Sequence, residues 1–69
     1  MRRDQVTSSN VAEIGYDPDS RILEVLFKTG SVYQYFEVPQ QIYEELMRAS
    51  SVGGFMNANL KGRYRYARV

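Results

Sequence analysis

The sequence predicts an α+β fold: a three-stranded antiparallel meander packed on one or two C-terminal helices, with a short extended segment at the C-terminal end. The segments 11–16, 21–27 and 31–38 have the apolar patterns of strands, and turn-forming residues separate them. Short connections favour antiparallel neighbours, so these segments are expected to form a meander. After Pro39 the apolar residues adopt the spacing of an amphipathic helix.

Length and composition restrict the class of protein. A chain of 69 residues makes one small domain, which buries only about 60% of the surface of its unfolded chain. We place this domain at residues 6–69, after a polar, flexible segment at 1–5. The chain has no Cys, no apolar run near the ~20 residues of a membrane span, and no signal-peptide pattern. A cytoplasmic protein without membrane contact is therefore expected.

Few side chains are suited to catalysis. The absence of His and Cys removes imidazole acid–base chemistry, thiol nucleophiles and the usual zinc ligands. The carboxylate pairs Asp17/Asp19 and Glu44/Glu45 lie in a predicted turn and on the solvent side of a predicted helix. Neither pair has the partner that acid–base catalysis requires. We therefore expect no enzymatic activity, no metal and no cofactor.

The turn between the second and third strands sets the orientation of two tyrosines. A three-residue loop at 28–30 places Gly30 in the left-handed region that glycine adopts without strain. This loop pairs Val25 with Tyr33 and Leu23 with Tyr35. Because side chains alternate along a strand, one face then carries an almost wholly apolar set: Leu23, Val25, Phe27, Tyr33 and Tyr35. We expect this face to point to the core, with the phenol oxygens at its edge.

The opposite face is mixed in character. It carries Ile22, Glu24, Leu26, Val32, Gln34 and Phe36. A two-residue loop would move both tyrosines to this face, because a slip of one residue exchanges the two faces. The face is too apolar to stay fully exposed, so the N-terminal segment, the C-terminal strand or a second copy of the protein is expected to cover it.

The helical region begins at Pro39, which suits the first turn of a helix because its missing N–H has no partner there. The helix is predicted over Pro39–Ala49. Ser51 is a candidate cap for a second, short helical turn that Gly62 would end, although two adjacent glycines disfavour it. The predicted core contains Ile14, Leu23, Val25, Phe27, Tyr33, Tyr35, Ile42, Leu46 and Phe55.

Basic and aromatic residues alternate near the C-terminus, where no acid follows Glu45. In an extended conformation Arg63 and Arg65 would project to one side, and Tyr64 and Tyr66 to the other. Cations meet phosphates and aromatic rings stack on bases, so the candidate nucleic-acid-binding residues are Tyr33, Tyr35, Lys61, Arg63, Tyr64, Arg65, Tyr66 and Arg68. The alternative is an ordinary edge strand, with tyrosines packed inward and arginines in solvent.

Several spaced motifs resemble the KTSC domain, a family found at the C-terminus of some lysyl-tRNA synthetases and as small stand-alone bacterial proteins. They are Val6-Thr7-Ser8-Ser9-Asn10-Val11, Ile14-Gly15-Tyr16-Asp17, Leu23-x-Val25-x-Phe27-x-x-Gly30-x-Val32-Tyr33-x-Tyr35, Val38-Pro39, Ala49-Ser50-Ser51-x-Gly53 and Tyr64-x-Tyr66. The resemblance spans nearly the whole chain, and the central Tyr-x-Tyr of the family matches Tyr33 and Tyr35. It implies no catalytic residues, and RNA binding is suggested by the synthetase context.

The sequence therefore supports two alternative hypotheses about the function. One is a non-catalytic accessory module that binds RNA, tRNA included, through the basic and aromatic C-terminal segment. The other is a protein-interaction module that uses the apolar sheet face or a sheet edge to bind a partner or a second copy of itself. The acid-free C-terminal third favours RNA, whereas the net charge of only +1 favours a protein partner.

Overall fold

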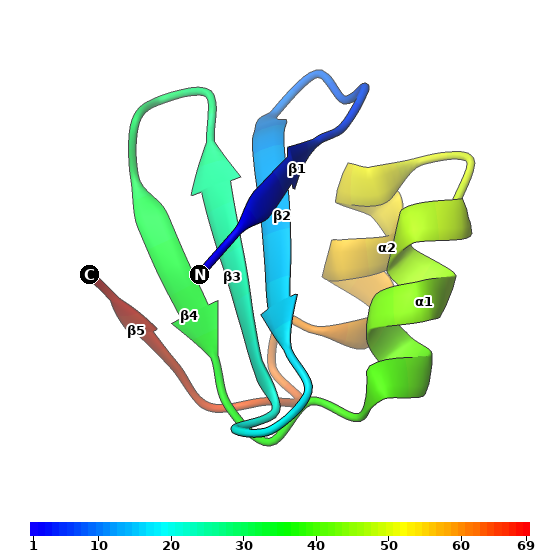
Figure 1. The fold of residues 1–69 in the computed structure, drawn as a ribbon. Coiled ribbons are helices and arrows are strands. Elements are labelled where there is room, and N and C mark those ends of the chain that lie inside the picture. The colour runs from blue at the N-terminus through cyan, green and yellow to red at the C-terminus, as the bar shows by residue number, and fades with distance from the viewer.

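One antiparallel sheet and two helices make up the computed structural model, which describes residues 1–69 (Figure 1). The strands lie in the order β1-β2-β3-β4-β5, so each strand pairs with its neighbour in the chain. Their bounds are β1 Arg3–Gln5, β2 Val11–Asp17, β3 Ile22–Phe27, β4 Val32–Tyr35 and β5 Tyr66–Arg68. The helices are α1 Gln40–Arg48 and α2 Val52–Asn59, which lie between β4 and β5 in the chain and on one side of the sheet.

The sheet has five strands, so the prediction of three was wrong. The added strands, β1 and β5, have three residues each and occupy the two edges. The polar sequence of β1 has no apolar alternation. Its Cα partners in β2 run from Arg3 opposite Gly15 to Gln5 opposite Glu13. Because this pairing uses backbone groups, the hydrophobic pattern of the sequence does not reveal the strand. The helices are also not C-terminal, because β5 follows them.

The β3–β4 hairpin has the predicted register. Val25 lies opposite Tyr33 and Leu23 opposite Tyr35. The Phe27 N–H donates to the Ser31 carbonyl at 2.9 Å, which closes a three-residue loop. Gly30 has φ +96°, a conformation that side chains with a Cβ rarely adopt. The alternative two-residue loop is therefore excluded, and the two tyrosines lie on the helix side of the sheet.

Both helices have identifiable ends. The predicted helix Pro39–Ala49 is present as α1 Gln40–Arg48, with Pro39 at its N-cap. The Ser51 hydroxyl accepts a hydrogen bond from the Gly54 N–H at 3.1 Å and so caps α2. This helix runs to Asn59, longer than the single turn expected. Gly62 has φ +80° just beyond its end.

The core lies between the sheet and the helices. Ten hydrophobic residues are buried there: Val11, Ile14, Leu23, Val25, Tyr35, Val38, Leu46, Val52, Met56 and Leu60. Five of them were predicted. Phe27, Tyr33, Ile42 and Phe55 pack against the core but are only partly buried. A bulge in β2 between Val11 and Glu13 shifts the register, which lets Val11 and Ile14 both face inward.

Candidate nucleic-acid interface

Four aromatic rings form a continuous cluster on the helix side of β3, β4 and β5. The Phe27 and Tyr33 rings meet edge to face, with their centroids 5.5 Å apart. Tyr33 stacks on Tyr66 at 5.6 Å, and Tyr66 is tilted against Tyr35 at 5.7 Å. The cluster exists because β5 places Tyr66 opposite Tyr35 in the sheet. Local sequence spacing alone would not bring the three tyrosines together.

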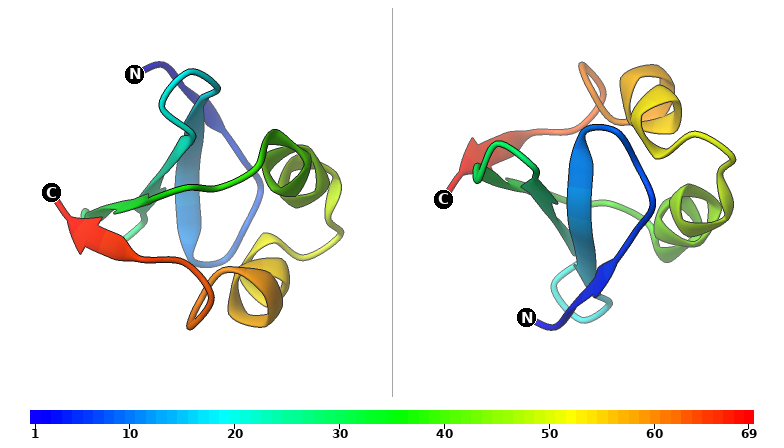
Figure 2. Two further views of the ribbon diagram at one scale, coloured as in Figure 1. Left: turned by 90° about the horizontal axis from the view of Figure 1, so that it is seen from below. Right: turned by 90° about the horizontal axis from the view of Figure 1, so that it is seen from above.

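The tyrosine rings of the cluster differ in exposure. Tyr35 is 3% exposed and belongs to the core, Tyr33 is partly buried, and Tyr66 is 59% exposed. In both views of Figure 2, β5, which begins at Tyr66, lies at the edge of the sheet away from the helices. The cluster is therefore anchored in the core on one side and presents aromatic surface to solvent on the other.

This cluster is the floor of a groove of about 750 Å³, which we call the aromatic groove. Lys28 of the β3–β4 hairpin and Lys61 of the α2–β5 connection line it, with Ser9 and Asn10 of the β1–β2 loop. The Asn10 carbonyl accepts a hydrogen bond from the Lys28 N–H at 2.9 Å, which fastens that loop to the hairpin. Three connections that are distant in sequence thus surround one aromatic surface. All the charged side chains in the lining are cations.

A second depression of about 590 Å³ adjoins the groove, and we call it the arginine depression. Arg63, Tyr64, Arg65 and Phe36 line it, and it shares Gly62 and Tyr66 with the aromatic groove. The Arg65 guanidinium lies 3.9 Å from the Glu37 carboxylate, and both side chains are more than three-quarters exposed. Such an exposed ion pair contributes little to stability, so Arg65 stays available to another anion.

The predicted binding residues divide between these two hollows. Tyr33, Tyr35, Lys61 and Tyr66 line the aromatic groove, and Arg63, Tyr64, Arg65 and again Tyr66 line the arginine depression. Arg68 lies opposite Tyr33 in β5, exposed and outside both linings.

The predicted alternation of Arg63 to Tyr66 along a strand was wrong. The strand begins only at Tyr66, and the residues before it form a turn. The turn follows from backbone bonds to the end of α2, because the Arg63 and Tyr64 N–H groups both donate to the Leu60 carbonyl.

Sequence reasoning missed several residues of the groove: Ser9, Asn10, Lys28, Thr29 and Ser31, and it assigned Phe27 only to the core. Lys28 could have been found, because the predicted hairpin loop places it beside the Phe27–Tyr33 pair. The β1–β2 loop carried no such signal.

The surroundings of Tyr35 change its acidity. Burial raises the pKa of Tyr35 above its ordinary value of about 10, and the nearby Tyr33 and Tyr66 hydroxyls raise it further. The phenol therefore stays neutral at any physiological pH. Tyr35 is the buried, uncharged ring of the aromatic cluster.

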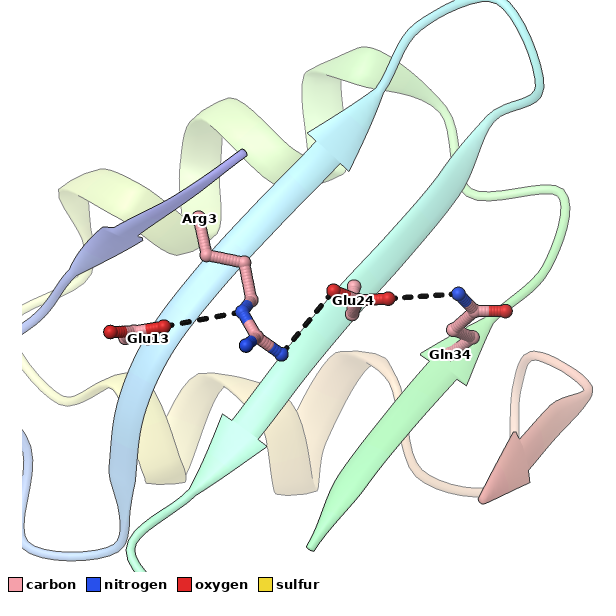
Figure 3. A network of polar contacts seen from close by, with 4 residues as sticks. All are labelled: Arg3, Glu13, Glu24 and Gln34. Carbon is pink, nitrogen blue, oxygen red and sulfur yellow. Dashed lines mark hydrogen bonds and ion pairs between the residues drawn. The ribbon is translucent and has the colours of Figure 1, made fainter. Parts of the chain in front are cut away.

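The opposite face of the sheet carries a chain of polar side chains (Figure 3). The Arg3 guanidinium lies 3.2 Å from the Glu13 carboxylate and 3.3 Å from that of Glu24. The Gln34 amide donates to Glu24 at 2.8 Å. The Glu24 side chain is only 13% exposed, so these partners satisfy a carboxylate that is mostly removed from water.

The N-terminal segment, one of the three coverings expected for this face, covers part of it. Arg3 of the N-terminal segment reaches across the sheet, from β1 to Glu24 on β3. Ile22, Leu26, Val32 and Phe36 are all partly buried. The sequence already places Glu24 and Gln34 in the middle of this face, and Arg3 joins them there, so the face is a weak basis for a protein-interaction surface.

Two further findings concern metal ligands and membrane-spanning helices. Nowhere do three or more acidic side chains come together as ligands of one metal ion. Neither helix has the length and apolar character needed to cross a bilayer.

Comparison with known proteins identifies the family. A family model described as the KTSC domain matches residues 7–64, most of the chain. The chain belongs to the KTSC domain family. The crystal structure of a KTSC domain protein from Yersinia pestis superposes with a TM-score of 0.96 at 38% identity, covering 99% of this chain and 96% of that one. The resemblance proposed from the motifs is thereby confirmed.

KTSC domains occur among the relatives in two settings. An uncharacterised protein of Stutzerimonas stutzeri is 40% identical over 70 residues, which cover 99% of its length. A lysine–tRNA ligase of a Nostoc species is 37% identical over 54 residues, which cover 78% of this chain but 10% of the ligase. The same fold thus stands alone as a small protein and forms a small part of a much larger enzyme.

Proposed function

We propose that this KTSC domain is a non-catalytic module that binds RNA, tRNA included. Unpaired nucleotides of the RNA bind in the aromatic groove. The observation that carries the proposal is the cluster of Tyr33, Tyr35 and Tyr66 between Lys28 and Lys61. Base stacking on an aromatic side chain contributes roughly 1–3 kcal/mol per base and tolerates any sequence. Lysines beside such a surface supply the attraction to phosphate.

The distribution of charge supports the proposal. Glu13 and Glu24 lie on the other face of the sheet, where Arg3 neutralises part of their charge. Glu44 and Glu45 lie on α1, where Gln40 and Gln41 donate to them. The lining of the groove carries Lys28 and Lys61 and no acid, although the net charge of the whole chain is only +1.

The relatives add a biological context. Lysine–tRNA ligases that contain a KTSC domain act on a tRNA, as their name states. A domain joined to such an enzyme and also present as a separate small protein suits an accessory RNA-binding role. We extend that role to this chain and place it in the cytoplasm with such enzymes.

Titration of a labelled single-stranded oligonucleotide and a labelled tRNA at several salt concentrations tests the proposal. About four phosphate contacts would give a slope of log affinity against log salt of roughly −3, at about −0.7 per contact. Replacing Lys28 and Lys61 together by alanine should weaken binding and flatten the slope by about 1.4.

The matched control replaces Arg2 and Arg48, which removes the same charge from exposed positions outside the groove. This control should change affinity much less than the lysine pair. Absence of binding by the wild type at low salt, or equal loss in both double variants, would reject the groove as an RNA site.

A further inference from the structure

The aromatic groove and the arginine depression adjoin each other. They share Tyr66 and Gly62, so the two hollows meet at the edge strand β5. The two parts differ in chemistry. The groove has an aromatic floor, whereas the depression carries the two arginines together with Phe36 and Tyr64.

We propose that the two parts divide the recognition of a nucleic-acid strand: the groove takes one unpaired nucleoside, and Arg63 and Arg65 hold the phosphodiester that follows it. The inference rests on the proposed function and specifies its ligand as a dinucleotide unit with a free base. A strand end or a single-stranded stretch offers this unit. A paired base inside a duplex does not expose its ring face for stacking.

The geometry of the rings supports the first half of this division. Tyr33 and Tyr66 stack at 5.6 Å, and Tyr66 is the exposed member of the pair. A base therefore finds an aromatic face that is already oriented by Tyr33 and Tyr35, with little side-chain ordering left to occur on binding. Lys28 and Lys61 then attract the strand without fixing its sequence.

The arginines support the second half. Arginine binds phosphate through a planar fork of donors, which suits a phosphodiester held at one place. Arg65 already has an anionic neighbour, the Glu37 carboxylate at 3.9 Å. A phosphate with access to both guanidinium groups would displace this exposed contact.

Competition against a labelled adenine octanucleotide separates the two parts, using adenosine, the dinucleoside monophosphate ApA, and the unlabelled octanucleotide. Adenosine carries no phosphate and ApA carries one phosphodiester. The wild type should bind ApA about tenfold more tightly than adenosine, because charge-assisted hydrogen bonds are formed only with ApA. The double variant Arg63→Ala/Arg65→Ala should lose this advantage and bind adenosine unchanged.

Two further variants sharpen the comparison. Tyr66→Ala should weaken adenosine and ApA together, because both ligands use the shared ring. Arg2→Ala/Arg48→Ala serves as the charge control and should keep the advantage of ApA over adenosine.

The outcomes distinguish this inference from the proposed function. If the octanucleotide binds but the arginine pair leaves the advantage of ApA intact, or if neither small ligand competes, the division is wrong and RNA binding stands. If the octanucleotide itself does not bind at low salt, the proposed function is rejected and the division with it.

Discussion

Gly15 lies on β2 opposite Arg3, and its missing side chain leaves room for the backbone of β1. A Cβ at this position would collide with the Arg2 carbonyl oxygen and lie 2.8 Å from the Arg3 Cγ. From its position opposite Gly15 on β2, the Arg3 side chain reaches Glu24 on β3. One small residue therefore permits both the edge strand and the polar chain on the outer face.

Replacing Gly15 by alanine should destabilise the protein by about 1–3 kcal/mol, as overpacking does when backbone must move. Urea unfolding measures this change. The matched control is Gly53→Ala in α2, where the nearest atom to a Cβ is 3.9 Å away. That substitution should be neutral or stabilising by up to about 1 kcal/mol, because alanine favours helix. Equal effects of the two substitutions would contradict the assigned contact.

The raised pKa of Tyr35 predicts a loss of stability at high pH. The unfolded chain releases this proton near pH 10, whereas the folded protein, in which burial raises the pKa, retains it to higher pH. Its contribution to stability is therefore complete below pH 10 and is lost as pH rises through the folded-state pKa.

Tyr35→Phe keeps the ring and removes the titration, so its free energy of unfolding should fall less steeply than that of the wild type above pH 10. Chemical unfolding of both proteins at a series of pH values measures the difference. Parallel curves for the two proteins would contradict the burial of the phenol.

At the scale of elements, α2 is stabilised by capping and burial and not by the helix propensity of its residues. Two glycines follow Val52, and the sequence alone disfavours a helix there. Ser51 satisfies the Gly54 N–H, and Val52, Met56 and Leu60 are buried against the sheet. Burial and capping together outweigh the low helix propensity. The end of α2 also sets the position of Lys61 in the groove.

Ser51→Ala should therefore cost about 1 kcal/mol of stability, the usual value for a lost side-chain cap. Thermal and urea unfolding check the value, and Ser50→Ala, at the exposed position next to it, is the control. A loss confined to Ser50→Ala, or equal in both variants, would show that the hydroxyl of Ser51 does not cap the helix.

At the scale of the whole molecule, the elements with strong local patterns were predictable. The hairpin register followed from the loop that ends at Gly30, and α1 followed from the apolar spacing after Pro39. The edge strand β1 was not predictable, because its residues are polar and its stability comes from pairing with β2.

The candidate site was predictable only in part, for the same reason. The aromatic and basic composition of the C-terminal segment indicated Tyr66 and Lys61, and the hairpin register placed Tyr33 on the helix side. The meeting of Asn10 with the hairpin at Lys28 is a tertiary contact between distant segments. No local pattern in a single sequence reports such a contact.

The central claim is that unpaired nucleotides bind on the helix side of β4 and β5, in the aromatic groove. Chemical-shift mapping of the ¹⁵N- and ¹³C-labelled protein with a single-stranded oligonucleotide tests it most directly. We predict that the largest shifts fall on Tyr33, Tyr66, Lys28 and Lys61, with the Glu24 and Gln34 signals of the opposite face unmoved. Shifts centred on Glu24 and Gln34, or no shifts at low salt, would contradict the claim.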